Sequence, residues 1–284
     1  MAAIAKVRPS PIAGIWYSSN AKTLANQIDA FLLEAAGDID PLNGEPVGVI
    51  APHAGYRYSG RTAGYAFATV IGRSYDLVIV VSPLHGYHPA EILTSGHRYY
   101  ATPLGEIAVD QQALQTLETS YKDATGLELA KLTNDGEHSL EIELPFLQRA
   151  LKGRFMLLPV MVRSFLPHVL LGLGKSLAQV AKGRSALLVA STDLSHFYPE
   201  KTAKSLDAVM LGQMEAFSPD GVLEAEQRGT GFACGAGAVA AVLWAAEFLG
   251  ANKVNLMHYS TSAAETGDRR SVVGYGAAAV IKQA

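Results

Sequence analysis

Residues 47–56, VGVIAPHAGY, give the clearest indication of the fold class of this chain. It begins with small and branched apolar residues and then turns to proline, histidine and glycine, as a buried strand that runs into a loop does. Residues 77–81, 155–161 and 186–190 have the same unbroken apolar character as residues 47–51. Unbroken apolar runs are typical of parallel strands whose two faces are both covered by helices.

Segments with helical periodicity lie between these runs. In residues 21–36, four apolar side chains recur on one stripe, and further helices are predicted at 140–151, 169–181, 202–217 and 236–249. A fifth strand, 272–281, is rich in glycine and alanine, so we expect another element to pack closely against it. The alternation predicts an α/β fold with three αβα layers and a mostly parallel central sheet. Because no linker or repeat interrupts the chain, residues 1–284 are expected to form a single domain.

Composition excludes several classes of protein. Hydrophobic residues make up 49% of the 284 residues and charged ones 17%, which excludes a disordered chain. The net charge of −3 gives no support for nucleic acid as a partner. Residues 1–8 are too short and too little apolar for a secretory signal, and residues 236–249 are too short to span a membrane. We therefore expect a cytoplasmic protein with no nucleic-acid and no membrane partner.

Histidines follow the predicted strands at the points where those strands end. His53 comes directly after strand 47–51, His85 follows strand 77–81, and the segment from Asp193 to His196 follows strand 186–190. Open α/β sheets bind ligands beyond the carboxyl ends of their strands. Each histidine alone is as readily a hydrogen-bonded loop residue, but the pair His53 and His85 favours a ligand-binding role.

Cys234 is the only cysteine, so the chain has no internal disulfide. It lies in a glycine-flanked segment directly before a predicted helix, where backbone N–H groups and the helix dipole favour the thiolate. A thiolate and two neutral imidazoles make a three-ligand transition-metal site with open positions. The alternative is that Cys234 is a small buried apolar residue.

Three further residues are candidates for proton transfer. Asp193 and His196 lie three residues apart in one loop, so the carboxylate is expected to orient the imidazole, unless the pair only braces the loop. His138 begins a segment in which it belongs either to the site or to the first turn of a helix. The motifs of a serine hydrolase elbow, a phosphate-binding loop and a paired Cys-x-x-Cys are absent from the sequence.

Two segments carry a resemblance to a known family. RPSPIAGIWY at 8–17 and APHAGYRYSG at 51–60 resemble the opening of the MEMO-like family, whose prokaryotic members are called AmmeMemoRadiSam system protein B. The likeness continues through HSLE at 138–141, STDLSH at 191–196, ACG at 233–235 and VVGY at 272–275. It therefore covers almost the whole chain.

The resemblance implies an αβα domain similar to class III extradiol (LigB-like) dioxygenases. It implies that His53, His85 and Cys234 hold one metal ion, and that His138, Asp193 and His196 are the neighbouring pocket residues with catalytic roles. No organic cofactor is implied. Fe(II) is the favoured metal, with Cu or Zn as alternatives, because a thiolate is a softer ligand than the glutamate of the dioxygenases. Radical-SAM and AMMECR-type proteins are the implied partners.

Three functions follow for the same pocket. The first is a non-haem metal-dependent redox enzyme, an oxidoreductase or dioxygenase-like protein that acts on an unknown small substrate. The second is a non-catalytic module that binds a peptide or partner. The third and least favoured is a zinc hydrolase, in which the metal lowers the pKa of a bound water molecule.

Overall fold

The computed structural model describes residues 6–133 and 135–283. Within these residues, nine strands form one sheet. Eight of them lie in a single order, and the ninth, β11 (Lys253–Thr261), pairs with β12 outside that order. Those eight run in the order β10 (His196–Tyr198), β12 (Val272–Lys282), β2 (Glu45–Ala51), β9 (Ala186–Ser191), β3 (Leu77–Pro83), β8 (Met156–Val162), β4 (Ile92–Ser95) and β7 (Ala130–Leu132). A small second sheet is formed by β1 (Val7–Arg8), β5 (Tyr99–Thr102) and β6 (Gly105–Ala108).

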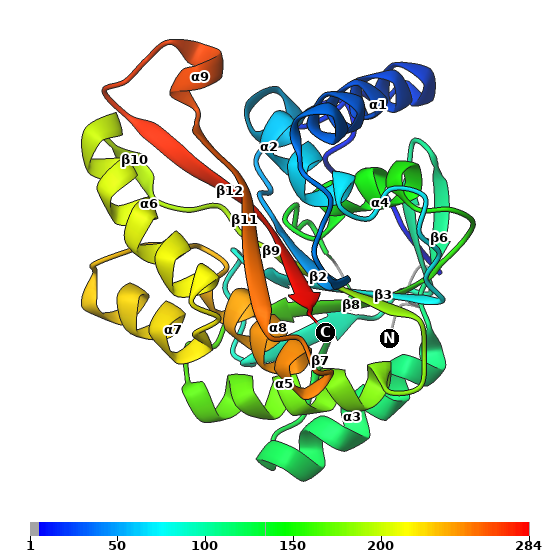
Figure 1. Ribbon diagram of the computed structural model, residues 1–284. Coiled ribbons are helices and arrows are strands. Elements are labelled where there is room, and N and C mark those ends of the chain that lie inside the picture. The colour runs from blue at the N-terminus through cyan, green and yellow to red at the C-terminus, as the bar shows by residue number, and fades with distance from the viewer. Residues whose placement is uncertain (1–5, 134, 284) are drawn as a thin grey trace.

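Helices cover both faces of the main sheet (Figure 1). One face carries α1 (Ala21–Asp38), α2 (Tyr56–Ala68) and α4 (Leu144–Ala150), and the other carries α3 (Gln111–Thr125), α5 (Pro167–Ala181) and α8 (Ala236–Phe248). The remaining helices are η1 (Glu141–Glu143), α6 (Glu200–Glu215), α7 (Pro219–Arg228) and α9 (Ala263–Thr266). None of the helices in the described part of the chain is long and apolar enough to cross a membrane.

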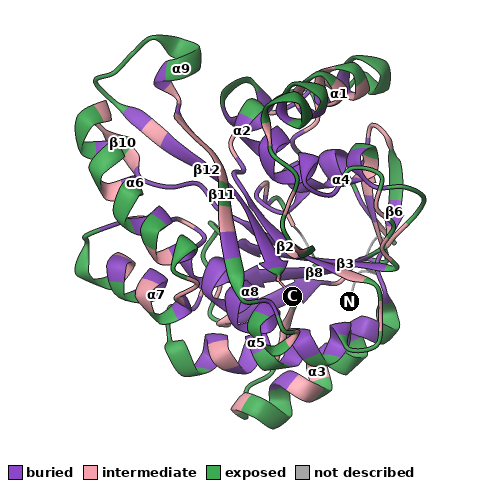
Figure 2. Cartoon of the chain, viewed as in Figure 1, coloured by how far each residue is buried: buried purple, intermediate pink, exposed green. Residues whose placement is uncertain are grey.

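Successive side chains of β9 point to opposite faces of the main sheet and pack into two separate hydrophobic cores. Leu187 and Val189 pack with α1, α2 and α4, whereas Leu188 and Ala190 pack with α3, α5 and α8. All four side chains are buried, and Figure 2 shows the central strands as buried along most of their length. A strand that is apolar on both faces is what the unbroken runs of the sequence predict.

The structure confirms the predicted αβα fold with its mostly parallel central sheet. Strands β2, β9, β3 and β8 are parallel neighbours, and the antiparallel pairs lie toward the margins. The glycine-rich strand β12 does receive a close neighbour, because the carboxylate of Asp207 lies against Gly274 and leaves no room for a Cβ atom.

Helix α2 is among the elements that the periodicity analysis did not predict. It contains Gly60 and Gly64, which are poor helix formers. A Cβ atom at Gly60 would lie 2.6 Å from Cε2 of Phe31, so glycine is required there for α1 to pack against α2. Tertiary packing therefore overrides local propensity in this helix.

A buried arginine ties the first strand to the loop that precedes η1. Arg8 is 1% exposed, and it donates hydrogen bonds to Asp135 Oδ2 at 2.6 Å, to the carbonyl oxygen of Glu137 at 2.6 Å and to Glu141 Oε2. Tyr17 also donates to Glu141, at 2.6 Å. Charges this deep are stable only when they are paired. Arg8 therefore positions the segment that carries Glu137 and His138.

Replacing Arg8 by Leu should lower the free energy of unfolding by about 3–5 kcal/mol, because the change leaves the Glu141 carboxylate buried beside an apolar side chain. Urea denaturation followed by circular dichroism measures the loss. The control is Arg149→Ala, which breaks an exposed pair with Asp29 and should cost less than about 1 kcal/mol. Equal losses in the two variants would contradict the role of Arg8.

Candidate metal centre

The register of the parallel strands brings three loops to one edge of the sheet. Ala51 of β2 lies opposite Ser191 of β9, and Ala190 of β9 lies opposite Val81 of β3. The loops that follow these strands therefore start at the same level. They carry three of the predicted site residues, namely His53, Asp193 and His85.

The N-terminal end of α8 brings Cys234 to this edge. The Cys234 amide donates to the Asp193 carbonyl oxygen at 3.2 Å, and the Asp193 amide lies 3.3 Å from Cys234 Sγ. Cys234 Sγ is 3.1 Å from His53 Nε2. One donor atom each of His53, His85 and Cys234 lies within 4.8 Å of the others, so the structure brings together the three residues predicted as metal ligands.

Hydrogen bonds select the tautomer of His53. Its Nδ1 atom lies 2.9 Å from the hydroxyl of Ser191, whose single proton points to the Ser139 carbonyl oxygen or to Glu143, each 2.7 Å away. Because the serine proton is used there, the serine oxygen accepts from Nδ1–H, and Nε2 keeps its lone pair on the side of Cys234. Burial, followed by the neighbouring His138 and His85, lowers the pKa of His53, so the ring is neutral.

The Glu137 carboxylate selects the tautomer of His85. It accepts from the His85 amide at 2.6 Å and from the amides of His138 and Ser139, and it lies 2.9 Å from His85 Nδ1. Burial alone would raise the pKa of Glu137, but these hydrogen bonds lower it below its usual range. The ionised carboxylate accepts Nδ1–H of His85 and leaves Nε2 as the metal-binding nitrogen. The hydrogen bond to Glu137 also raises the pKa of His85.

We call His53, His85 and Cys234 the ligand group. His138 lies beside this group as part of a stack of rings. Its ring centroid is 4.1 Å from that of Trp16 and 4.7 Å from that of His85. Burial lowers the pKa of His138 to about 4, so the ring is neutral at pH 7. His85, Glu137 and His138 form a second, overlapping group of close donor atoms. Because the Glu137 oxygens already accept backbone amides, the group with Cys234 is the better metal site.

The expected contact between Asp193 and His196 has to be corrected. His196 Nδ1 lies 2.8 Å from the Leu194 carbonyl oxygen, while Asp193 Oδ1 accepts the His53 amide at 2.7 Å. The backbone therefore orients His196, and the Asp193 carboxylate braces the loop of His53. Burial raises the pKa of Asp193 to about 7, although amide hydrogen bonds partly oppose the shift.

The expectation that Cys234 is a thiolate is also wrong for the metal-free chain. Burial and the charge of Asp193 raise the pKa of the Cys234 thiol, and they outweigh the amides of Asp193 and Gly235. The sequence places the cysteine before a helix but does not show how far the sulfur is removed from water. A metal ion would therefore displace the thiol proton when it binds.

A cavity of about 800 Å³ opens onto the ligand group. Its lining includes His53, His85, His138, Asp193 and His196. Aromatic side chains, including Trp16, Tyr58, Phe197 and Tyr275, line its walls. We call this cavity the large pocket. All the predicted site residues except Cys234 thus line one cavity.

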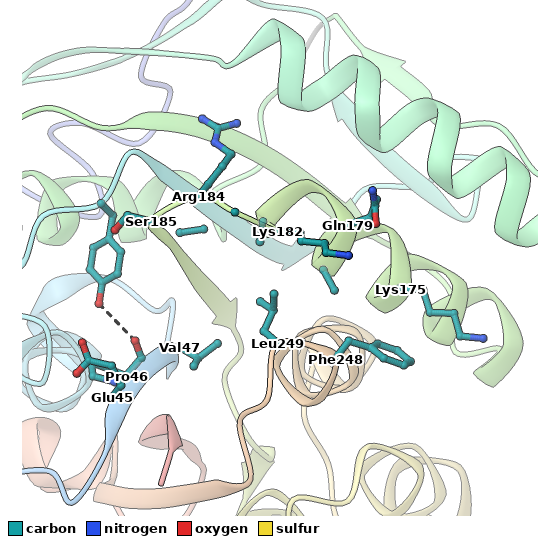
Figure 3. Close-up of a pocket in the computed structure, with 15 residues that line it drawn as sticks. Glu45, Pro46, Val47, Lys175, Gln179, Lys182, Arg184, Ser185, Phe248 and Leu249 are labelled. Carbon is teal, nitrogen blue, oxygen red and sulfur yellow. Dashed lines mark hydrogen bonds between the residues drawn. The ribbon is translucent and has the colours of Figure 1, made fainter. Parts of the chain in front are cut away.

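Another cavity, of about 640 Å³, lies at the opposite ends of the strands (Figure 3). It is bounded by the first residues of β2 and by the last turns of α5 and α8, and Lys175, Lys182 and Arg184 lie around it. Among the described residues that line it there is no histidine or cysteine. The predicted metal ligands therefore lie away from this cavity.

Comparison with known proteins places this arrangement in a family. The model of the Memo-like protein family matches residues 8–279. The chain belongs to the Memo-like family. A MEMO1 family protein of Nitrosopumilus maritimus is 34% identical over 276 residues, which is 95% of this chain and 98% of that protein. A MEMO1 family protein of Thermotoga neapolitana is 33% identical over 281 residues, with the same two coverages.

Several residues of this site were not predicted from the sequence. Glu137 directly precedes His138 and Ser191 lies two residues before Asp193, but their role in orienting the imidazoles depends on contacts across 52 and 138 residues of chain. The signal for Glu137 was an acidic residue directly before His138. Trp16 was quoted only as part of a family motif, although its ring stacks on His138.

The Glu137→Gln variant should bind Zn(II) about 10- to 100-fold more weakly, because an amide cannot accept all the N–H groups that face this carboxylate. Isothermal titration measures the affinity. The matched control is Glu128→Gln, which alters an exposed carboxylate paired with Lys122 and should leave the affinity unchanged. An unchanged affinity in a folded Glu137→Gln protein would show that Glu137 does not orient a ligand.

Proposed function

We propose that this chain binds one transition metal ion through His53, His85 and Cys234, and that it acts as a non-haem metal-dependent redox enzyme on an organic molecule in the large pocket. The convergence of these three donors beside that pocket carries the proposal. A thiol with two imidazoles suits Fe(II), Cu or Zn, whereas Mg²⁺ and Ca²⁺ prefer oxygen ligands. Three protein ligands also leave coordination positions open.

The two imidazoles fit such an ion in their tautomers as well as in their distances, and the ion would displace the thiol proton of Cys234. Metal-binding imidazoles must be neutral, and the tautomers of His53 and His85 each leave Nε2 without a proton. When bound, the metal would supply Lewis-acid or electron-transfer chemistry. The remaining functional groups belong to the chain itself.

His196 is the group best placed to take up a proton. Its Nδ1 bonds to the Leu194 carbonyl oxygen and must carry the proton, so Nε2 is the basic nitrogen of this pocket-lining residue. Burial lowers the pKa of His196, so the ring is neutral and able to accept a proton at pH 7. Asp193, with a pKa of about 7, is a second group that can hold a proton in the same pocket.

The walls of the large pocket indicate the kind of molecule it holds. Trp16, Tyr58 and Tyr275 offer aromatic surface near the histidines, and Ser262 and Thr266 offer hydroxyl groups in the same lining. Such a lining suits an organic molecule with an apolar or planar part and polar substituents.

The Cys234→Ala variant should lose its bound metal, since the change removes the thiolate ligand. Protein purified without oxygen is analysed for iron, copper and zinc, with His168→Ala as a control because His168 is an exposed histidine outside the site. The control should keep the metal content of the unaltered chain. An unaltered chain that contains none of these metals and binds none of them tightly would refute the proposal.

A second candidate function is capture of a peptide or partner without catalysis. Its support is that Ile15 and Phe197, which line the large pocket, are 78% and 75% exposed. In that case Cys234→Ala would leave partner binding intact. Association with radical-SAM and AMMECR-type proteins stays a prediction of the resemblance, and co-purification would test it.

A further inference from the structure

A second, smaller cavity reaches the ligand group from another side. It measures about 140 Å³ and is lined by Cys234, His85, Arg163 and Phe165, and by Gly237 and Ala238 of α8. We call it the Cys234 cavity. The large pocket is lined by His53 and His85, whereas the Cys234 cavity is lined by His85 and Cys234. The three ligand residues therefore lie between the two cavities.

The two cavities differ in charge. Asp193 and Asp268 line the large pocket, whereas Arg163 is the one formally charged side chain, histidine aside, among the described residues that line the Cys234 cavity. Arg163 contacts the Gly86 carbonyl oxygen and lies over the ring of Tyr87, and neither contact neutralises its charge. The N-terminal end of α8 adds a partial positive charge.

The walls of the Cys234 cavity are held in place by packing. A Cβ atom at Gly237 would lie 2.5 Å from the Ser164 carbonyl oxygen, so α8 is packed directly against the segment after β8. Ser164 and Ala238 are buried, whereas Phe165 is 53% exposed and marks the outer side. The volume is close to that of a cavity of about 150 Å³ that holds a benzene molecule. The space therefore suits a ligand of about six heavy atoms or fewer.

We infer that the Cys234 cavity is a binding site for a small anion, which reaches Cys234 without passing through the large pocket. The anion is a ligand additional to the organic molecule of the proposed function. Its role at a metal rests on that proposed function, but its access to the sulfur does not. The inference can therefore be tested on the metal-free protein.

The charge preference is tested by alkylation of Cys234, the only cysteine in the chain. Iodoacetate and iodoacetamide have similar size and differ in charge. In both, the Cys234 thiol loses its proton to solvent, the sulfur bonds to the reagent carbon and iodide leaves, and intact-protein mass spectrometry gives the rate. Arg163→Gln should reduce the ratio of the iodoacetate rate to the iodoacetamide rate by about fivefold at fixed pH. Any change in the thiol pKa affects both reagents and cancels in the ratio.

The matched control is Arg57→Gln. Arg57 also lies over a tyrosine ring, that of Tyr58, but it neighbours the large pocket. This variant should leave the ratio unchanged. A ratio that falls with Arg57→Gln and not with Arg163→Gln would overturn the inference.

The route is tested with variants that change the size of each cavity. Ala238→Leu should slow both reagents at least tenfold, and Phe165→Ala should accelerate both, because the first fills the Cys234 cavity and the second opens its outer side. Val273→Trp, which narrows the large pocket, should change neither rate. Slowing by Val273→Trp together with no effect of the other two variants would overturn the inference.

Two further measurements separate this inference from the metal proposal. Cooperative thermal unfolding of each variant establishes that it is folded, and Phe165→Ala serves as the exposed-site variant if Ala238→Leu does not fold. Addition of Zn(II) should protect Cys234 from both reagents if the metal site exists. Absence of that protection with the alkylation pattern intact would refute the proposed function and leave the Cys234 cavity established.

Discussion

The parallel pairing of β2, β9 and β3 fixes where the residues of the candidate metal centre lie. The ladder sets Ala51 opposite Ser191 and Ala190 opposite Val81, so three loops leave the sheet at one level. A slip of one residue would turn every side chain of a strand to the other face. The buried apolar side chains on both faces oppose such a slip because each face packs against its own helices. The position of the candidate metal centre is thus a consequence of sheet register.

Two buried glutamates beside this edge are in different electrostatic states. Glu137 accepts three backbone amides and a ring N–H, and these donors keep it ionised despite its burial. Glu143 has Ser191 as its hydrogen-bond partner, and burial raises the pKa of Glu143 well above its usual value. The group that accepts Nδ1–H of His85 is therefore negatively charged, whereas Ser191 and Glu143, on the Nδ1 side of His53, are neutral. The two imidazoles are oriented by the same principle but differ in electron donation.

The ligand group divides two spaces that suit different molecules. The large pocket has aromatic walls and two aspartates, and the Cys234 cavity has an arginine and the positive end of a helix. Membership of the Memo-like family accounts for the shared motifs. The charge difference between the cavities favours anions on the side of the sulfur and disfavours them on the side of the histidines. The proposed function and the proposed anion site together describe a centre that two different molecules approach from separate cavities.

The layered fold and the position of the site could be predicted from the sequence. Unbroken apolar runs indicate buried strands, and the carboxyl ends of parallel strands lie at one edge of a sheet. His53 and His85 were therefore expected to meet, and the residue type of Cys234, with the family motifs, added the third donor. Only the tertiary structure decided that Glu137 orients His85 and that the Cys234 thiol is protonated. Those properties depend on desolvation and on contacts between segments far apart in the chain. The pattern of apolar residues within one segment does not show such contacts.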